Sequence, residues 1–594
     1  MPSLAVLATW SLATLWLLLL GSPAAVTAAR HVGWVAALRV GLWFGLAIAL
    51  LSVLIINFFL PLAGSPARLI LAIVTGAAVI AAITIVIVVR RRAMPATSQA
   101  RTPFPYWSLI VIASLAICML TIAHAAFGAA NNWDAGLYHM NAIQYAAEYR
   151  VIPGLANLHD RFGVTNSQHL LTATLMGSGW GLEAFRLEVG FFVLLLAFEI
   201  TLRLIDTRKS GSRLGTVVLL LAAAGLIPFL LSRPNEQLTS PTPDPVSMIV
   251  IFVAAAFLVD GLGSRRVEWI AAGLVTAAAA ASVRSQLWAF VVLTAVVLAV
   301  IAARRRRWSV RPRALLIASG LLSAALLIAT QVRDVIHSGW VLFPLDLWAL
   351  PVDWRFPDPS AARVSIVTWA RDPGATPEEV LNSWSWVGGW LGRSAGDWSI
   401  RWMLGTLALA ATIWLAQRRL GTRIPQTLVG ATNARWSAGL LLLIPIALVV
   451  GLWFLSAPDP RFAWGPIALL GVIPASVALT GVLGKLSVPL AAGIAALTLM
   501  PSGLAAVGSI DGELEEGQEV VKFTSVPWTI TAGLTPVPQR EFTVFPLPTG
   551  EPIVQPNGGD RCWQTFPLCT PYPNAEVVFR GDSLQDGLAN RYIR

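Results

Sequence analysis

The chain has 594 residues, of which 56% are hydrophobic and only 12% are charged, and its mean hydropathy is +0.70. Soluble domains carry about a quarter charged residues, so this composition excludes a soluble globular protein and indicates an integral membrane protein. The formal net charge is +11. Because the arginines cluster between apolar runs, they are typical of membrane-orientation signals, and we expect no nucleic-acid partner.

Apolar runs long enough to cross a bilayer recur along most of the chain, since a span needs about 20 apolar residues. The first run has no basic segment before it, so we interpret it as a span and not as a cleaved signal. We expect an all-α integral membrane bundle of about 13–14 transmembrane helices. The candidate spans are residues 3–21, 39–61, 68–89, 106–127, 186–205, 214–232, 245–262, 268–283, 287–303, 314–330, 402–417, 437–455, 463–483 and 487–507.

Basic residues fall on alternate connections between these spans. Six connections together hold 20 Lys and Arg residues, and one topology places all of them in the cytoplasm. The opposite side then carries the long loop after the fourth span, residues 128–185, as well as the loop 331–401 and the tail from 508 onward. The loop 331–401 is rich in Trp and Pro, and we expect it to form a partly helical cap.

This pattern divides the chain into three parts: N-terminal transmembrane helices in residues 1–105, a transmembrane core in 106–507, and an extracytoplasmic C-terminal domain in 508–594. The last part contains short β-like runs amid Pro and Gly, such as "QEVVKFT", "EFTVFPL" and "AEVVFRG". Such runs are typical of a small α/β or β-rich appendage.

Two of the three cysteines lie in this C-terminal domain. Cys562 and Cys569 have six residues between them and no His partners that would favour a zinc site. We expect a disulfide, which requires an oxidising compartment. The orientation derived from the basic residues places the domain on that side independently.

Asp134 is the leading candidate for chemistry. It precedes "AGLYHMNAIQYAAEYR", whose apolar spacing predicts an amphipathic helix at the membrane surface. A carboxylate at membrane level is costly and commonly lines a water-filled cavity, where it can take a proton from an incoming hydroxyl. Alternatively Asp134 caps the helix N-terminus, and both roles can hold together.

Further titratable residues follow in the same loop: His139, His159 and Asp160. Paired His and Asp side chains can bind a divalent metal or orient a base. No tight ligand spacing such as His-x-x-x-His occurs here, so a structural hydrogen-bonding role is favoured over ligation, and we assign no metal ligand.

Arginine and carboxylate residues recur in the other outer loops. Guanidinium groups beside carboxylates suit an anionic substrate such as a lipid phosphate, and local surface salt bridges are the alternative. The candidates for substrate binding are Arg150, Arg161, Asp244, Arg284, Arg333, Asp459 and Arg461.

Several familiar motifs are missing from the sequence. It contains no Walker sequence, Rossmann fingerprint or Gly-x-Ser-x-Gly elbow, so ATP-driven transport and serine hydrolase chemistry lose support. Glu188 and Glu199 in the fifth span keep a proton- or ion-coupled carrier open as an alternative.

The chain has many spans, a long outer loop with an acidic residue just after a span, and a polar C-terminal domain. In this layout it resembles the GT-C class of polytopic glycosyltransferases. More closely, it is similar to a family of uncharacterised bacterial membrane proteins, through "WDAGLYHMNAIQYAAEYRVIPGLANLHDRFGVTNSQH", "SPTPD", "HSGWVLFPLD", "APDPRF" and "CWQTFPLCTPYPN…RGDSLQDG".

The resemblance implies a GT-C-like enzyme at the outer face of the bacterial cytoplasmic (inner) membrane. It would move a sugar from a polyprenyl-phosphate donor to a cell-envelope glycan or glycolipid acceptor. Asp134 would act as the base, with His139, His159 and Asp160 as orienting groups. The loop reads "NNWDAG" and lacks an Asp-x-Asp or Glu-x-Asp pair, which leaves a divalent cation optional. The alternatives are a carrier or flippase of lipid-linked glycans and a non-catalytic envelope-assembly membrane protein.

Overall fold

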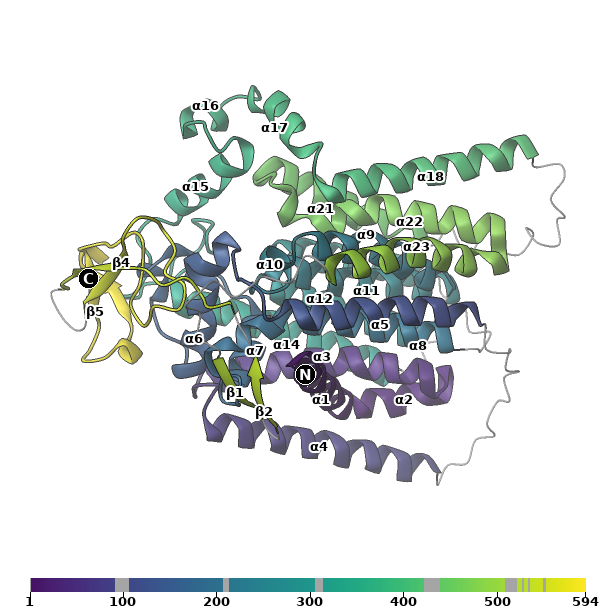
Figure 1. Cartoon of the computed structure of the whole chain (residues 1–594), viewed down its shortest axis with the longest axis horizontal. Coiled ribbons are helices and arrows are strands. Elements are labelled where there is room, and N and C mark those ends of the chain that lie inside the picture. The colour runs from purple at the N-terminus through teal and green to yellow at the C-terminus, as the bar shows by residue number, and fades with distance from the viewer. Residues whose placement is uncertain are drawn as a thin grey trace.

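The computed structural model describes residues 2–90, 106–206, 213–304, 313–420, 439–507, 521–525, 528–532, 535–547 and 552–593. This part of the chain is mostly helical, and ten of its helices are long and apolar enough to cross a membrane. The long helices lie roughly parallel in one bundle (Figure 1). The helices therefore have the arrangement of a multi-pass membrane protein.

Each of the fourteen predicted spans contains a helix of this bundle. Four of these helices are not among the ten: α12, α13 and α21 are shorter, and α8 carries several charged residues. The short helix α2 was not predicted. The bundle consists of α1 (Pro2–Leu20), α2 (Ser22–Val32), α3 (Trp34–Asn57), α4 (Ser65–Arg90), α5 (Trp107–Ala125), α8 (Glu188–Ile205), α9 (Arg213–Ser232), α11 (Pro243–Ser264), α12 (Val267–Val283), α13 (Trp288–Arg304), α14 (Arg313–Ser338), α18 (Trp398–Leu420), α21 (Leu443–Ser456), α22 (Trp464–Leu483) and α23 (Ser487–Val507).

The first two helices pack against α3 at a crossing built from glycines. A Cβ added to Gly45 would lie 1.8 Å from the carbonyl oxygen of Leu17, and one added to Gly21 would lie 1.7 Å from that of Gly41. Backbones can approach this closely only where side chains are absent, as in other helix contacts of membrane proteins. The crossing fixes the N-terminal helices on the bundle.

A buried ion network joins α3, α8 and α11. Glu199 Oε1 accepts hydrogen bonds from Arg39 Nε at 2.8 Å and from Arg203 Nε at 2.7 Å. Arg203 Nη1 also donates to Asp260 Oδ2 at 2.7 Å, and all four side chains are fully buried. Two positive and two negative charges balance one another, which is how charges are tolerated inside a bilayer.

The predicted loops gather at one end of the bundle, on the left in Figure 1, which we call the loop end. Short helices and helical turns make up most of it. They are η1 (Ala135–His139), α6 (Met140–Glu148), η2 (Leu155–Asn157), η3 (Asp160–Gly163), α7 (Ser167–Met176), η4 (Gly181–Leu187), α10 (Pro234–Gln237), η5 (Ser285–Leu287), α15 (Pro359–Arg371), α16 (Pro377–Leu381), α17 (Trp386–Ser394) and η6 (Pro460–Phe462). The turn η7 (Gly484–Leu486) joins α22 to α23 at the opposite end of the bundle.

The C-terminal part contains three antiparallel pairs of short strands, β1–β2, β3–β4 and β5–β6. The predicted small β-rich appendage is therefore present, and each of the three β-like runs contains a strand. The remaining elements are β1 (Val521–Ser525), β2 (Trp528–Ala532), β3 (Phe542–Phe545), β4 (Ile553–Pro556), β5 (Val577–Phe579), η8 (Leu584–Asp586), β6 (Leu588–Asn590) and η9 (Arg591–Ile593).

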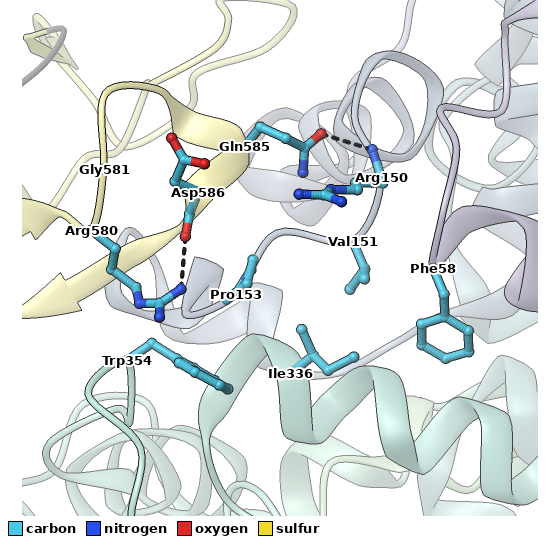
Figure 2. Close-up of a pocket in the computed structure, with 10 residues that line it drawn as sticks. All are labelled: Phe58, Arg150, Val151, Pro153, Ile336, Trp354, Arg580, Gly581, Gln585 and Asp586. Carbon is cyan, nitrogen blue, oxygen red and sulfur yellow. Dashed lines mark hydrogen bonds between the residues drawn. The ribbon is translucent and has the colours of Figure 1, made fainter.

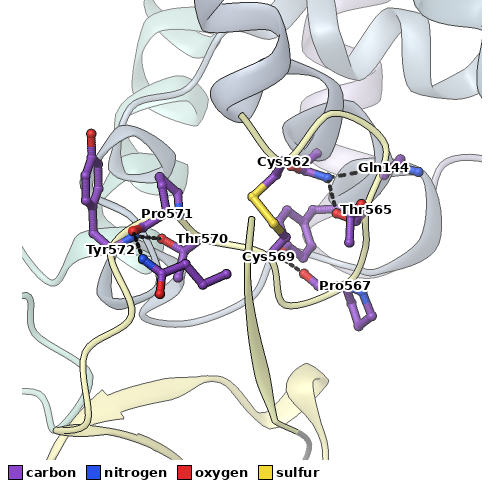
Figure 3. Close-up of a disulfide and its surroundings, with 11 residues drawn as sticks. Gln144, Cys562, Thr565, Pro567, Cys569, Thr570, Pro571 and Tyr572 are labelled. Atoms are coloured by element: carbon purple, nitrogen blue, oxygen red, sulfur yellow. Dashed lines mark hydrogen bonds between the residues drawn. A yellow bond between two sulfur atoms is a disulfide. The ribbon is translucent and has the colours of Figure 1, made fainter. Parts of the chain in front are cut away.

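A disulfide joins Cys562 to Cys569 and closes a short loop of this domain (Figure 3). The loop docks onto η1: the Trp563 backbone N–H donates to the Gly136 carbonyl at 2.8 Å. A Cβ on Gly136 would lie only 2.9 Å from the Trp563 indole. The C-terminal domain is thus held directly against the residues that follow Asp134.

The predicted helix after Asp134 is confirmed as η1 and α6, but its expected polar face is not exposed. Asn141 and Gln144 are as buried as the apolar residues Met140 and Ile143. The reason is the C-terminal domain, since Asn141 Nδ2 donates to the Thr565 carbonyl at 2.9 Å. Protein therefore covers the side of the helix that we expected to face water.

Candidate functional site

Asp134 lies at the loop end in an ion pair with a residue far along the chain. Arg461 Nη1 donates to Asp134 Oδ2 at 2.9 Å, and Arg461 Nε donates to Asp459 Oδ2 at 3.0 Å. The side chains of Asp134 and Arg461 are 25% and 31% exposed, so the pair is reachable from solvent. The two carboxylates outweigh the effect of burial and raise the pKa of Arg461 above its ordinary value.

The proposal that Asp134 caps the following helix is wrong. Its carboxylate makes no capping hydrogen bond. Instead Asn132 Oδ1 accepts the backbone N–H of Ala135 at 3.1 Å. The neighbouring amide therefore satisfies the helix start, and the Asp134 carboxylate points to Arg461.

A second guanidinium group lies beside the first. Arg284, in the short connection between α12 and η5, forms an ion pair with Asp244 at the start of α11. The guanidinium carbons of Arg284 and Arg461 lie 5.0 and 5.2 Å from the ring centroid of Phe462. Burial lowers the pKa of Arg284 to about 10, so the group stays charged at neutral pH. Four segments distant in sequence thus supply two cations and three carboxylates.

Tyr138 stands at the centre of these groups. Burial and the carboxylate of Asp134 raise its pKa above the ordinary value. Its ring centroid lies 4.1 Å from that of His139 and 6.2 Å from that of His159. Three guanidinium groups are close enough to oppose the pKa shift: those of Arg161, Arg284 and Arg461.

A buried chain of hydrogen bonds runs inward from His139, and we call it the histidine relay. His139 Nδ1 lies 2.9 Å from His169 Nε2, and His169 Nδ1 lies 2.9 Å from Glu188 Oε2. Thr172 Oγ1 also donates to Glu188 Oε2 at 2.8 Å. Because Glu188 Oε2 accepts from Thr172, a neutral His169 that donates to it through Nδ1 accepts at Nε2. His139 must then donate through Nδ1, which leaves the lone pair on its Nε2.

His139 is held in the neutral form. Burial, the neighbouring His169 and the positive charges of Arg284 and Arg461 all lower its pKa well below the ordinary value. A neutral imidazole with a fixed tautomer can accept a hydrogen bond or a proton at one defined nitrogen. The relay therefore leaves His139 Nε2 as a single acceptor on a ring that lies beside that of Tyr138.

His159 and Asp160 form a separate pair at the edge of the site. His159 Nδ1 lies 2.8 Å from Asp160 Oδ1. Burial alone would raise the pKa of Asp160, but the hydrogen bond and charge of His159, together with Arg161, lower it below the ordinary value. The Asp160 carboxylate thus keeps its negative charge beside Arg161.

Two of the predicted substrate-binding arginines do not join this cluster. Arg333 is buried in α14, where its Nη2 donates to Asn57 Oδ1 at 3.2 Å. Arg150 is exposed and lines a different pocket of about 600 Å³ between the C-terminal domain and the loops (Figure 2). Trp354 and Arg580 also line that pocket.

The sequence analysis did not identify Tyr138 or His169 as site residues, and it did not predict that Glu188 is part of the histidine relay. A usable signal was present, because His169 and Glu188 are polar residues placed within or at the start of otherwise apolar runs. In the described part of the chain, no group of three or more His, Cys, Asp or Glu side chains could hold a metal ion.

A family model described as a domain of unknown function (DUF8201) matches residues 4–468. The match begins in α1 and ends in α22, so it contains Asp134, the histidine relay and Arg461. No curated protein and no solved structure matches the chain.

Proposed function

The chain belongs to the DUF8201 family, and we propose from the chemistry of its candidate site that it is a membrane glycosyltransferase. It moves a sugar from a polyprenyl-phosphate donor to a cell-envelope glycan or glycolipid acceptor. The site then faces the extracytoplasmic side of the bacterial inner membrane. The sugar chemistry comes from the GT-C resemblance, and the anion and base chemistry come from the site itself.

The observation that carries the proposal is the ion pair of Asp134 with Arg461, with the guanidinium group of Arg284 beside it, at the end of a transmembrane bundle. Arg461 uses Nη1 and Nε for Asp134 and Asp459, and Arg284 uses Nη1 for Asp244. A guanidinium has five N–H donors, so both can still bind phosphate oxygens. A lipid phosphate at the membrane surface fits these unused donors.

In the proposed reaction, the acceptor oxygen attacks the anomeric carbon of the sugar. The bond from that carbon to the phosphate oxygen breaks, and the phosphate leaves with the electron pair. The acceptor proton passes to the ionised carboxylate of Asp134, which acts as general base. Arg284 and Arg461 stabilise the charge that develops on the leaving phosphate.

His139 has a positioning role in this scheme. Its neutral imidazole, oriented through His169 and Glu188, offers a hydrogen-bond acceptor close to Tyr138. A sugar hydroxyl bound there would be held at a fixed distance from Asp134. Correct orientation of reactants supplies a large part of the rate of such reactions.

The carrier alternative requires acids that change protonation within the membrane. Two of the buried acids, Glu199 and Asp260, are paired with arginines at 2.7–2.8 Å, and a third, Glu188, accepts hydrogen bonds from His169 and Thr172. Removing a partner from such a buried pair leaves an uncompensated charge. The ion pairs therefore support a structural role for Glu199 and Asp260, because a carrier would need acids that are free to gain and lose a proton. For this reason we favour an enzyme over a carrier.

The proposal is tested by lipid analysis of cells that lack the chain and carry a plasmid copy of it. Cells without the chain should accumulate a polyprenyl-phosphate-linked sugar, and the wild-type copy should clear it. Asp134→Asn should not clear it, although the variant is present in the membrane in equal amount. The matched control is Asp372→Asn, which alters an exposed carboxylate paired with Arg393 and should clear the lipid fully. An unchanged lipid-linked pool in cells without the chain would refute the proposal.

A further inference from the structure

The helices α15, α16 and α17 lie beyond the edge of the bundle at the loop end, outside α18 and α21, at the top left of Figure 1. We call this segment, residues 359–394, the overhang. Its connection to the bundle is short, because α17 ends at Ser394 and the candidate membrane span α18 begins at Trp398. The overhang therefore lies next to the point where the chain enters the bundle, on a side where lipid surrounds a membrane protein.

The neighbouring helix α21 carries an exposed apolar stripe along its whole length. Ile444, Leu448, Leu452 and Leu455 are 49–59% exposed, and their spacing of three or four residues places them on one side of the helix. Lipid tails are as apolar as leucine, so this side suits contact with lipid. The stripe reaches the last turn, and the chain becomes polar soon afterwards at Asp459. The end of α21 therefore marks the lipid–water boundary at this edge of the bundle.

The overhang packs directly against the last turn of α21. The ring of Trp384 stacks on that of Phe454, with centroids 6.4 Å apart, and the ring of Trp390 lies 5.2 Å from the same phenyl ring. Arg371 Nη2 donates to the Leu455 carbonyl at 3.0 Å. These contacts fix the overhang at the level where the apolar stripe ends.

One face of α17 extends this apolar surface. The Val387 N–H donates to the Trp384 carbonyl at 3.1 Å, so the first helical turn starts at Trp384. Trp384, Gly388 and Leu391 follow one another at spacings of four and three residues, which places them on one face. Trp384 is 62% exposed and Leu391 is 57% exposed. A Cβ added to Gly388 would meet no atom of the described residues within 4 Å, so this face is open.

The charge of the overhang favours an apolar contact over an electrostatic one. Its three basic and three acidic residues balance: Arg363, Arg371 and Arg393 against Asp372, Glu378 and Glu379. A segment without net charge gains little from anionic lipid headgroups, whereas buried apolar area contributes in any bilayer.

We propose that the face of α17 formed by Trp384, Gly388 and Leu391 rests on the lipid–water boundary at the loop end and anchors the overhang to the membrane. Tryptophan is the residue typical of this boundary, since its ring is apolar and its N–H is polar. The occupant of the face is the interfacial layer of the bilayer, whatever the charge of its lipids.

The anchor also affects the candidate site, because the overhang holds the segment that follows α21. Trp390 Nε1 donates to the Pro458 carbonyl at 2.5 Å, and Trp453 Nε1 donates to the Asp459 carbonyl at 2.8 Å. Arg461 lies two residues further along. The contact with lipid thus keeps Arg461 at the level of the lipid headgroups, and it does not depend on the transfer reaction.

The test is the depth of a nitroxide spin label in the full-length protein, in nanodiscs of phosphatidylcholine. Oxygen concentrates among lipid tails, whereas a water-soluble nickel chelate stays in water. The label is attached at Gly388→Cys in a Cys118→Ala background. Gly76→Cys in the candidate span α4 and Gly559→Cys in the C-terminal domain are the lipid and water references, since a Cβ at either position also meets nothing within 4 Å.

The label at Gly388→Cys should collide with the nickel chelate several-fold less often than the label at Gly559→Cys, and with oxygen more often. Adding anionic phosphatidylglycerol should not change its depth. Trp384→Ser/Leu391→Ser should raise the nickel collisions toward the value at Gly559→Cys. Trp348→Ser, which alters an exposed tryptophan outside the overhang, should leave them unchanged.

Three results would overturn the proposal. One is a label at Gly388→Cys that is as accessible to nickel as the water reference. Another is shielding from both nickel and oxygen, which would show that protein, such as a second copy of the chain, covers the face. The third is shielding from nickel only when anionic lipid is present. Because no transfer assay is involved, these outcomes are separate from the fate of the proposed glycosyltransferase.

Discussion

Arg461 Nη1 lies 2.9 Å from Asp134 Oδ2, although 327 positions separate the two residues in sequence. Arg461 follows α21 and Asp134 follows α5, so the pair connects two loops that lie far apart in the chain. Together with Asp459 and Arg284, it forms the group of charges on which the proposed activity rests. Because the helices of the bundle hold these loops in place, the first prediction concerns the packing of the helices.

The glycine crossing should be essential for stability. Gly45→Ala would place a methyl group against the Leu17 carbonyl, and such overpacking costs about 1–3 kcal/mol or more. We expect a clearly lower unfolding temperature in detergent. Gly76→Ala is the matched control, because nothing lies within 4 Å of a Cβ at that position of α4. If both variants unfold at the wild-type temperature, the close crossing is not present in solution.

The disulfide should stabilise the docking of the C-terminal domain. Closing a loop of this length contributes about 2–3 kcal/mol on a chain-entropy basis. In Cys562→Ser/Cys569→Ser, or after reduction, limited proteolysis should remove the C-terminal domain faster, while the helical bundle resists. Cys118→Ala removes the buried free cysteine and should leave the cleavage rate unchanged. Equal cleavage rates of all three proteins would show that the disulfide does not hold the domain.

His139 should make the stability depend on pH. Its pKa in the folded protein lies well below the ordinary value, whereas the unfolded chain takes up a proton near pH 6.5. The contribution of His139 to the free energy of unfolding is therefore fully present above that pH. It is lost as the pH falls below it, by at most about 1.4 kcal/mol per pH unit.

Thermal unfolding between pH 8 and pH 5.5 measures this effect. The decline should be flatter in His139→Asn than in the wild type. His31→Asn is the control, since the His31 side chain is 42% exposed, and its decline should match the wild type. A decline of equal slope in His139→Asn would show that this histidine is not the neutral, buried group described above.

The helical architecture could be predicted because it depends on local sequence. A membrane span needs a continuous apolar run, so each of the fourteen predicted spans overlaps a helix, and ten of these helices among the described residues are long and apolar enough to cross a membrane. The short helix α2 was missed because "SPAAVTAARHV" is too short and too polar to read as a span. It packs against α3 and α4 through small buried residues, and a search for long apolar runs does not reveal such a contact.

The site could be predicted only in part, because its geometry depends on contacts between distant loops. Asp134 was identified from its position after a span, but its partner was not, and the neighbouring Asn132 took the expected capping role. Arg150 and Arg333 were included because they are basic residues near the loops. Nothing in the local sequence distinguishes them from Arg461, which differs only in where the bundle places it.

The central claim is that Arg461 and Arg284 bind a lipid phosphate beside Asp134. Its most direct test is the retention of radiolabelled polyprenyl phosphate by the purified protein in nanodiscs. Arg461→Gln should weaken retention about tenfold, because charge-assisted hydrogen bonds are lost. Arg393→Gln, which alters an exposed guanidinium paired with Asp372, should retain the lipid as the wild type does. Equal retention by Arg461→Gln and the wild type would contradict the account.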